Sequence, residues 1–255
     1  MGHPGAPNHD HHRSLWFAHN DLMGVDFWSE NTPARIVQKQ WYAIQEQDEF
    51  ATIGLELHWL DGHDPQAIAR QNVFITLRAN EDTWSLELQS DFLGGGQGVA
   101  FRKSNFGILG LRVAKSLSSV FGAGTMTGSS GDVGEKSLFG KANRWVDITG
   151  PIELKENGQH TVEGLALIDH RDNPGHPAKW HVRDDGWMGP SLSRDQDIPL
   201  DSPLPLTIRY LLCAHSGPVD AAAVGRWADE FDTRPAWSVS KGTQPHFQWD
   251  LTPRR

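Results

Sequence analysis

The chain has little of what marks a disulfide-stabilised or nucleic-acid-binding protein. Only one of its 255 residues, Cys213, is a cysteine, so no internal disulfide can form. Its place in the apolar stretch "LTIRYLLCAHS" predicts a buried structural thiol. Acidic residues outnumber basic ones, and the formal net charge is -9. Because proteins that bind phosphate backbones need a basic surface, nucleic acid is not an expected partner.

Long apolar runs are also missing. No run approaches the roughly 18 residues that suggest a membrane-spanning helix. No charged-then-apolar leader opens the sequence either. We therefore expect no membrane partner and a cytoplasmic location. Residues 1–11 are rich in His, Pro, Gly and Asn, and we expect them to be mobile.

Tryptophan and histidine, in contrast, are abundant. The chain has 11 tryptophans and 13 histidines but only 2 tyrosines. An indole is a large flat apolar surface that fills a core or stacks on a sugar ring. The stretch "NHDHHRSLWFAHNDLMGVDFW" gathers both residue types between Asn8 and Trp28. It is a candidate for a metal site, for the rim of a ligand pocket or for an aromatic chain end without a ligand.

Alternation of apolar and polar residues dominates the rest of the chain. In "TIGLELHWL", Ile53, Leu55, Leu57 and Trp59 fall on one face, the pattern of a strand with one side buried. We expect further strands at "NVFITLRAN", "DTWSLELQS", "WYAIQEQ", "FGILGLRVA", "RWVDITG", "HTVEGLALIDH", "KWHVRD" and "PLTIRYLLCAH". Glycine and proline punctuate them.

One segment, "SGPVDAAAVGRWADEF", has the period of a helix. Val224, Trp227, Ala228 and Phe231 form one apolar stripe, and Ser216 is the expected N-cap. Many strands followed by one short C-terminal helix predict an all-β protein, an antiparallel β-sandwich. No repeat or long linker divides the chain, so we expect a single domain over residues 1–255.

The block "ALIDHRDNPGHPAKWHVRDDGW" is the strongest local cluster of chemically active residues. Pro174 and Pro177 cannot continue a strand, so a stiff loop joins the strand that ends at residues 169–170 to the one that starts near residues 180–181. This brings two histidines, a carboxylate and an indole to one sheet end. The set suits general acid–base chemistry on a hydroxylated ring. The alternative is a rigid loop whose histidines hydrogen-bond its own backbone.

A metal site is a further alternative. His12, His170 and His181 are the imidazoles best placed to hold a divalent zinc, iron or copper ion. The sequence contains no HExxH or CxxC motif and no facial-triad spacing, so no cofactor is predicted.

A polar strand face offers another possible floor for a sugar. Glu56 and His58 alternate with the apolar residues of their strand, and Arg78 and Glu87 lie on neighbouring strands. If this face curves inward it can bind a ligand; if it faces bulk water it is an ordinary solvated surface.

Four stretches, "DHHRSLWFAHNDLMGVDFW", "FGILGLRVA", "GKANRWVDITGP" and "GLALIDHRDNPGHPAKWHVRDDGWMGP", occur in this order over most of the chain. Together they resemble a bacterial family of PmoA-like proteins that carries the label "methane oxygenase PmoA". A membrane methane monooxygenase subunit needs several spanning helices, which this sequence lacks. The resemblance instead implies a soluble β-sandwich, mutarotase-like or jelly-roll-like, and a role in carbohydrate catabolism.

The same resemblance bears on which strands form the edge of the sheet. Members of that family usually carry several more strands before "HHR", whereas eleven residues precede His12 here. Either the chain begins late relative to that family, or its sandwich lacks an edge strand. In the second case we expect an exposed sheet edge through which the protein could form a homo-oligomer.

Combining the residues with the resemblance, we hypothesise that the two histidine-tryptophan clusters meet in one pocket. The expected function is an enzyme of sugar catabolism that applies histidine acid–base chemistry to a glycoside or keto-sugar, as a lyase, epimerase or hydrolase. The alternatives are a non-catalytic carbohydrate-binding module and a metal-dependent hydrolase or oxygenase. The expected catalytic residues are His181, His170, Asp169 and Arg112; the expected sugar-binding residues are His12, Arg13, Trp16, His19, Trp28, Asn173, His176, Trp180 and Arg183.

Overall fold

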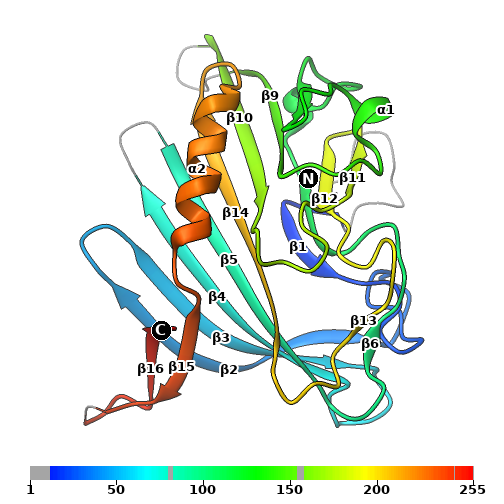
Figure 1. Ribbon diagram of the computed structural model, residues 1–255, viewed down its shortest axis with the longest axis vertical. Helices are drawn as coiled ribbons and strands as arrows, with labels where there is room; N and C mark the ends of the chain where they lie inside the picture. The colour runs from blue at the N-terminus through cyan, green and yellow to red at the C-terminus, as the bar shows by residue number, and fades with distance from the viewer. Residues whose placement is uncertain (1–11, 80–82, 154–157, 244, 255) are drawn as a thin grey trace.

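Antiparallel strands make up most of the molecule, which confirms the all-β prediction (Figure 1). The structure is a computed structural model and describes residues 12–79, 83–153, 158–243 and 245–254. The segment 1–11, for which we expect mobility, lies outside these ranges.

The larger of the two main sheets has eight strands. In spatial order they are β2 (Arg35–Glu46), β3 (Ala51–Leu60), β4 (Ala69–Ala79), β5 (Thr83–Gly94), β14 (Leu206–Ser216), β10 (His160–Asp169), β9 (Trp145–Glu153) and β8 (Thr125–Gly128). Each of the strands expected from the alternating pattern in this region is present, with β2 extending further toward the N-terminus than "WYAIQEQ" indicates.

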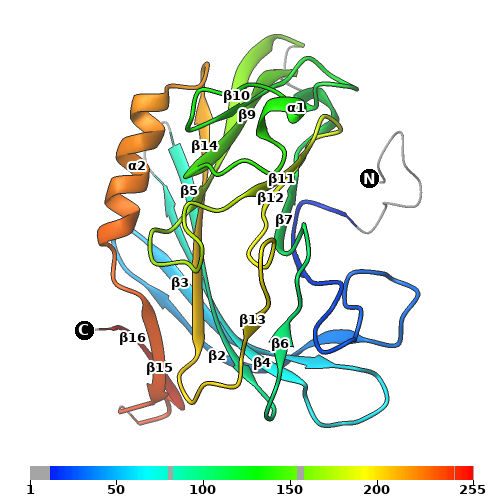
Figure 2. The ribbon, with the colours of Figure 1, turned by 45° about the vertical axis from the view of Figure 1, so that its right-hand side comes forward.

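The second main sheet has four strands and faces the large one (Figure 2). Its order is β1 (Leu15–Ala18), β7 (Ile108–Arg112), β12 (Trp187–Pro190) and β11 (Trp180–Arg183). Two small ribbons, a 3-10 turn and a short helix complete the β framework: β6 (Ala100–Phe101) with β13 (Ile198–Pro199), β15 (Trp237–Lys241) with β16 (Trp249–Pro253), η2 (Lys115–Leu117) and α1 (Glu135–Leu138).

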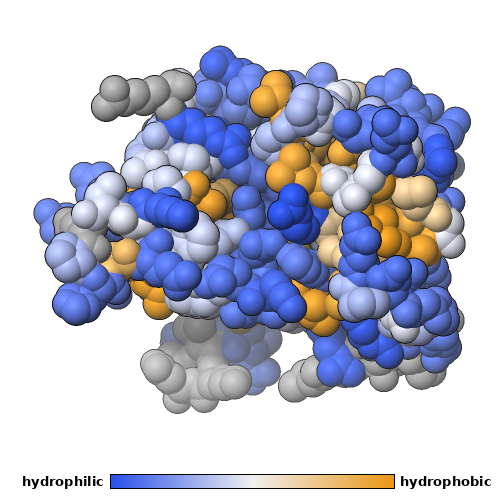
Figure 3. All heavy atoms as spheres, turned by 90° about the horizontal axis from the view of Figure 1, so that it is seen from below, coloured by the Kyte–Doolittle hydropathy of each residue, from blue (hydrophilic) through white to orange (hydrophobic). Residues whose placement is uncertain are grey.

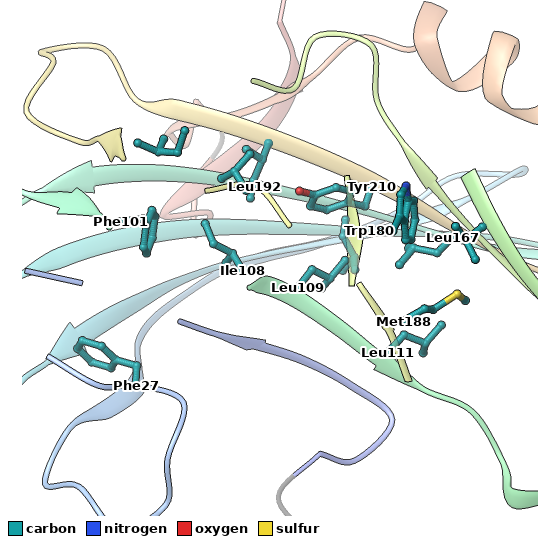
Figure 4. Close-up of a cluster of buried hydrophobic side chains, with 14 of the residues drawn as sticks. Phe27, Phe101, Ile108, Leu109, Leu111, Leu167, Trp180, Met188, Leu192 and Tyr210 are labelled. Carbon is teal, nitrogen blue, oxygen red and sulfur yellow. The ribbon is translucent and has the colours of Figure 1, made fainter. Parts of the chain in front are cut away.

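The main core lies between the two sheets. Leu167 and Tyr210 of the large sheet meet Leu109, Trp180 and Met188 of the small one (Figure 4). Each fully buried aliphatic side chain contributes about 2 kcal/mol to stability through loss of water contact. We call the face of the large sheet that contributes to this core its inner face.

The outer face of the large sheet is covered by helix α2 (Ala221–Thr233) and by the β15–β16 hairpin (Figures 1 and 2). The predicted helix is confirmed, and its stripe packs on Cys213, whose burial raises the pKa of the thiol to about 12. The N-cap prediction is wrong. Ser216 ends β14, and Asp220 caps the helix by accepting from the Ala222 and Ala223 amides, because Gly217 first turns the chain in a left-handed conformation.

The surface seen from below is largely hydrophilic, with apolar residues gathered in separate patches (Figure 3). No helix in the described ranges has the length and hydropathy needed to cross a membrane. The outermost strands of the large sheet are β2 and β8. The far side of β8 is bridged by Val133, whereas within the described ranges no strand pairs with the far side of β2.

Candidate functional site

A pocket of about 400 Å³ lies where the segment before β1, the loop before β7 and the β11–β12 hairpin meet. We call it the aromatic pocket. It joins part of the N-terminal histidine-tryptophan stretch to part of the second cluster, although the two are far apart in sequence. Its walls are His12, Trp28, Asn105, Phe106, His181, Arg183, Asp185 and Trp187.

Aromatic rings form a continuous wall on one side of the pocket. The His12 ring stacks on Trp16 with 5.1 Å between centroids and meets Trp28 edge-on at 5.0 Å. Trp187 contacts both indoles, and Phe106 packs against Trp28 at 4.4 Å. Such a wall presents flat apolar surface of the kind that stacks on a ligand ring.

The wall depends on a glycine in the neighbouring strand. Trp16 on β1 lies directly opposite Gly110 on β7, and a Cβ at Gly110 would lie 2.4 Å from the indole atom Cζ2. Because glycine has no side chain, the indole can lie flat against β7. The stretch "FGILGLRVA" therefore contributes to the pocket because Gly110 has no side chain that would displace the Trp16 indole.

His181 is the buried titratable group of the pocket. Its Nδ1 lies 3.1 Å from the Asn105 carbonyl oxygen, which can only accept, so Nδ1 carries the proton and donates it. Burial, helped by the charges of Arg183 and Arg194 and opposed by this hydrogen bond, lowers the pKa of His181 to about 4. The ring stacks on Trp187 at 4.2 Å. At neutral pH Nε2 is thus an unprotonated acceptor beside an indole.

Several polar atoms around the pocket are buried and make no hydrogen bond within the described part of the chain. They are Nε2 of His181, the indole nitrogens of Trp16 and Trp187, and Nη2 of Arg112. Buried polar atoms are rarely left unpaired, because each one loses its water without compensation. One acceptor and several donors at a single site indicate a place for a polar ligand or for ordered water.

Arg112 holds two walls of the pocket together. Its Nε donates to the His12 carbonyl at 3.1 Å, while Nη1 donates to the Asp185 carbonyl and pairs with the Asp185 carboxylate. At the rim, Arg183 pairs with Glu135 at 2.8 Å. Both arginines are therefore paired with carboxylates.

Asp169 lies elsewhere, in a second polar cluster that we call the Asp169 network. The Asp169 carboxylate accepts from Asn173 Nδ2 at 2.8 Å, from the Ala178 amide at 2.8 Å and from His176 Nδ1 at 2.9 Å. Asn173 also exchanges two hydrogen bonds with the backbone of Arg209. These contacts fix the "DNPGHP" loop to strand β14. The loop is held by Asp169 and Asn173, whereas the rigid-loop alternative expects histidines bonded to the loop backbone.

His170 and Trp180 also lie outside the aromatic pocket. His170 packs edge-on against Phe231 of α2, and burial together with Arg209 lowers its pKa. Trp180 is fully buried between the sheets (Figure 4). Its indole nitrogen donates to the Asn143 carbonyl at 2.7 Å. Because consecutive residues of a strand point to opposite faces, β11 sends Trp180 into the core and His181 into the pocket. The two clusters therefore meet in the pocket in part: His181 and Arg183 lie there with His12 and Trp28, whereas Asp169, His170 and Trp180 of the second cluster lie outside it.

A family model matches residues 2–229 of the chain and is described as a family of unknown function, DUF6807. The chain belongs to the DUF6807 family. A search of curated proteins finds no match. The match includes every residue of the aromatic pocket and of the Asp169 network, and it ends before the β15–β16 hairpin of this DUF6807 chain. The family description names no activity, so the resemblance to PmoA-like proteins stays a prediction.

The remaining expected site residues of this DUF6807 chain do not line the pocket. His19 is buried and fully hydrogen-bonded, since Nε2 lies 2.9 Å from the Ser193 hydroxyl and Nδ1 accepts from the Asp21 amide. Burial lowers its pKa to about 4. Arg13 is exposed and is not one of the pocket walls. Of the candidate metal ligands only His12 and His181 lie together, and the described residues contain no group of three His, Cys, Asp or Glu placed to hold an ion.

The polar strand face predicted as a possible sugar floor belongs to the outer face of the large sheet. Glu56 accepts from Tyr42 at 2.9 Å and lies 2.7 Å from His58, and Glu87 pairs with Arg209. Internal partners thus occupy these groups. Sequence reasoning missed Asn105, Phe106, Asp185 and Trp187 as walls; the last two follow His181 within the quoted motif, whereas nothing local marks the first two.

Proposed function

We propose that the protein is a carbohydrate-acting enzyme that binds an uncharged sugar ring in the aromatic pocket and uses His181 as its general acid–base. The observation that supports this most directly is the state of His181. Its Nδ1 proton is held by a backbone carbonyl, and its Nε2 lone pair is buried without a partner in the described chain. A neutral imidazole held in one tautomer is the form required of a general base.

The walls fit the chemistry of a sugar. Indole faces stack on the apolar side of a pyranose ring, Nε2 of His181 accepts from a hydroxyl, and indole N–H groups donate to ring or hydroxyl oxygens. The pocket volume of about 400 Å³ lies within the usual range for small-ligand sites. Because the rim charges are paired, an uncharged ligand fits better than a sugar acid or phosphate.

A keto-sugar gives His181 a proton to move. Nε2 takes the proton from the carbon beside the carbonyl, the C–H electron pair shifts toward that carbonyl, and its oxygen becomes an enolate that accepts from a buried N–H donor. The negative charge then stabilises the imidazolium that forms beside it. Loss of a leaving group from the next carbon, with the proton on His181 passing to that group as it departs, completes an elimination.

A second candidate, a non-catalytic carbohydrate-binding protein, is favoured by one specific feature. A pKa of about 4 makes His181 a weak base in the empty pocket, and the ring makes no hydrogen bond to a described carboxylate. Accepting a hydroxyl hydrogen bond requires no more than this. Turnover therefore decides between the two candidates.

The experiment is proton NMR of the protein with a panel of glycosides and their 3-keto derivatives. We expect new product signals with wild-type protein that are lost with His181→Ala and retained with His63→Ala, a matched change at an exposed histidine. Broadened sugar signals without product would favour the binding protein. Equal turnover by wild type and His181→Ala would rule out the acid–base role, and absence of both turnover and binding across the panel would rule out a carbohydrate ligand.

A further inference from the structure

The edge of the large sheet at β2 is long, and within the described ranges no strand pairs with its outer side, although Tyr42 packs against Trp249 of β16. β2 has 12 residues, and within the described ranges its only hydrogen-bonded neighbour is β3. The outward-facing backbone N–H and C=O groups of such a strand are free to pair with another strand. The opposite edge strand, β8, has only 4 residues.

Two large apolar side chains are exposed at the middle of this edge. Trp41 is 43% exposed and Ile44 is 56% exposed. They are three residues apart, yet both lie on the inner face, because a register shift between Trp41 and Ala43 places them opposite Leu55 and Ile53 of β3. An exposed apolar pair on a free edge marks a contact surface rather than a solvated strand.

Charges of opposite sign flank the apolar pair. Arg35 and Lys39 precede it, and Glu46 follows it at the end of the strand, with Glu49 in the next turn; all four are exposed. An antiparallel copy of the same strand runs in the opposite direction, so the basic half of one copy meets the acidic half of the other. Lysine at an edge usually discourages pairing, but here a carboxylate of the second copy would face it.

We propose that β2 is a dimerisation strand that pairs antiparallel with β2 of a second copy of this chain, so that the two large sheets become one continuous sheet. The register places Trp41 opposite Ile44 of the second copy, and the two-fold axis repeats this contact. These two residues lie on matching faces, since both are on the inner face, and Gln40 and Gln45, which also pair, are both on the outer one. Lys39 is the extra residue of a second register shift, between Gln38 and Gln40, and its long side chain would reach Glu46 of the second copy from this bulge.

A second copy explains the edge better than an unrelated peptide. An isologous contact requires a surface that is complementary to itself, with each element present together with its partner. β2 carries Lys39 and Glu46, the two members of the charge pair, and Trp41 and Ile44, the two members of the apolar contact. All four lie within six residues of the centre of the strand. A peptide ligand would need neither feature in this order.

The test is sedimentation velocity of the full chain over a range of concentrations, with charge reversals that separate this interface from others. We expect a concentration-dependent dimer for the wild type, and a dissociation constant at least about ten-fold weaker for Lys39→Glu and for Glu46→Lys, because each reversal places like charges opposite one another. Mixing the two single variants should restore a dimer, since each interface then contains complementary pairs. Lys136→Glu, at an exposed position of α1, is the matched control.

The apolar contact is tested separately with Trp41→Ser, which should also shift the equilibrium to monomer while circular dichroism shows retained strand content. A wild-type protein that remains monomeric at all concentrations would overturn the proposal. So would a dimer that none of the three β2 variants weakens, or a mixture of the charge variants that stays monomeric.

Discussion

The aromatic pocket and the Asp169 network contain the same residue types but differ in how completely their polar side chains are hydrogen-bonded. In the network the carboxylate of Asp169 has three protein donors, and the side chain of Asn173 is paired at both its oxygen and its nitrogen. In the pocket His181 uses one ring nitrogen and leaves the other buried without a partner in the described chain. His176 of the network and His181 of the pocket come from one stretch of sequence.

The difference shows that hydrogen-bond completeness, not residue type, separates a structural cluster from a candidate site. A fully paired buried network stabilises one loop conformation and has nothing left to offer a ligand. A buried acceptor without a partner costs stability, and a folded protein usually retains that cost where a ligand relieves it. The following predictions test this contrast through stability, acid sensitivity and packing.

The largest effect is expected from Asp169→Ala. It removes the acceptor of three buried donors and leaves Asn173 Nδ2 with a single partner, so we expect the free energy of unfolding to fall by about 4 kcal/mol. His181→Ala, which removes one paired nitrogen and one unpaired nitrogen, should cost much less than this. Urea unfolding followed by tryptophan fluorescence measures both.

Asp169→Asn keeps the shape of the side chain and one acceptor oxygen, and should give an intermediate loss that remains measurable if the alanine variant does not fold. A loss for His181→Ala as large as that for Asp169→Ala would mean that both clusters are structural, and the contrast between them would disappear.

The second effect is on how the free energy of unfolding changes as the pH falls. The folded pKa of His181 is lowered to about 4, below its unfolded value of 6.5, so the unfolded state binds a proton more readily between these two values. The stability associated with the neutral ring is therefore complete above pH 6.5 and is lost as the pH falls toward 4. His181→Asn removes this term, so its loss of stability between pH 7 and pH 4.5 should be smaller than the wild-type loss by about 2 kcal/mol.

Paired urea titrations at the two pH values measure this difference, and His63→Asn, at an exposed loop position, serves as the control. An acid sensitivity that is the same in wild type and His181→Asn would show that His181 titrates normally and that Nε2 reaches water. His19 has a similarly low pKa and remains in all three proteins, so its contribution cancels.

The sheet architecture could be predicted from sequence because alternation is a local signal. "TIGLELHWL" and "DTWSLELQS" each contain their own evidence of one buried and one exposed face, and the structure confirms both strands. The cap of α2 was misplaced because Ser216 and Asp220 are both good caps, and only the turn at Gly217 shows which of them starts the helix.

The site could be predicted only in part, because its partition depends on contacts between distant residues. The sequence places Trp180 and His181 side by side and gives both the same aromatic character. Which of them faces the core depends on the register of β11 with β12, where His181 pairs with Gly189. Asn105 has no local feature at all, yet its backbone carbonyl sets the tautomer of His181 across a separation of 76 residues in sequence.

The smallest effect is expected from Gly110→Ala, and it acts on the pocket without touching a polar atom. The new methyl group would lie 2.4 Å from the Trp16 ring, so the indole must leave the surface of β7. Since Trp16 is only half-buried it can swing outward, and we expect a stability loss of about 1 kcal/mol, at the low end for overpacking.

The stack with His12 would break, however, and with it the wall on which a ring would lie. Near-ultraviolet circular dichroism should therefore change clearly while urea unfolding changes little, and affinity for any sugar identified by NMR should fall about ten-fold or more. A Gly110→Ala protein whose aromatic spectrum changes while its affinity stays unchanged would show that the Trp16 indole takes no part in binding.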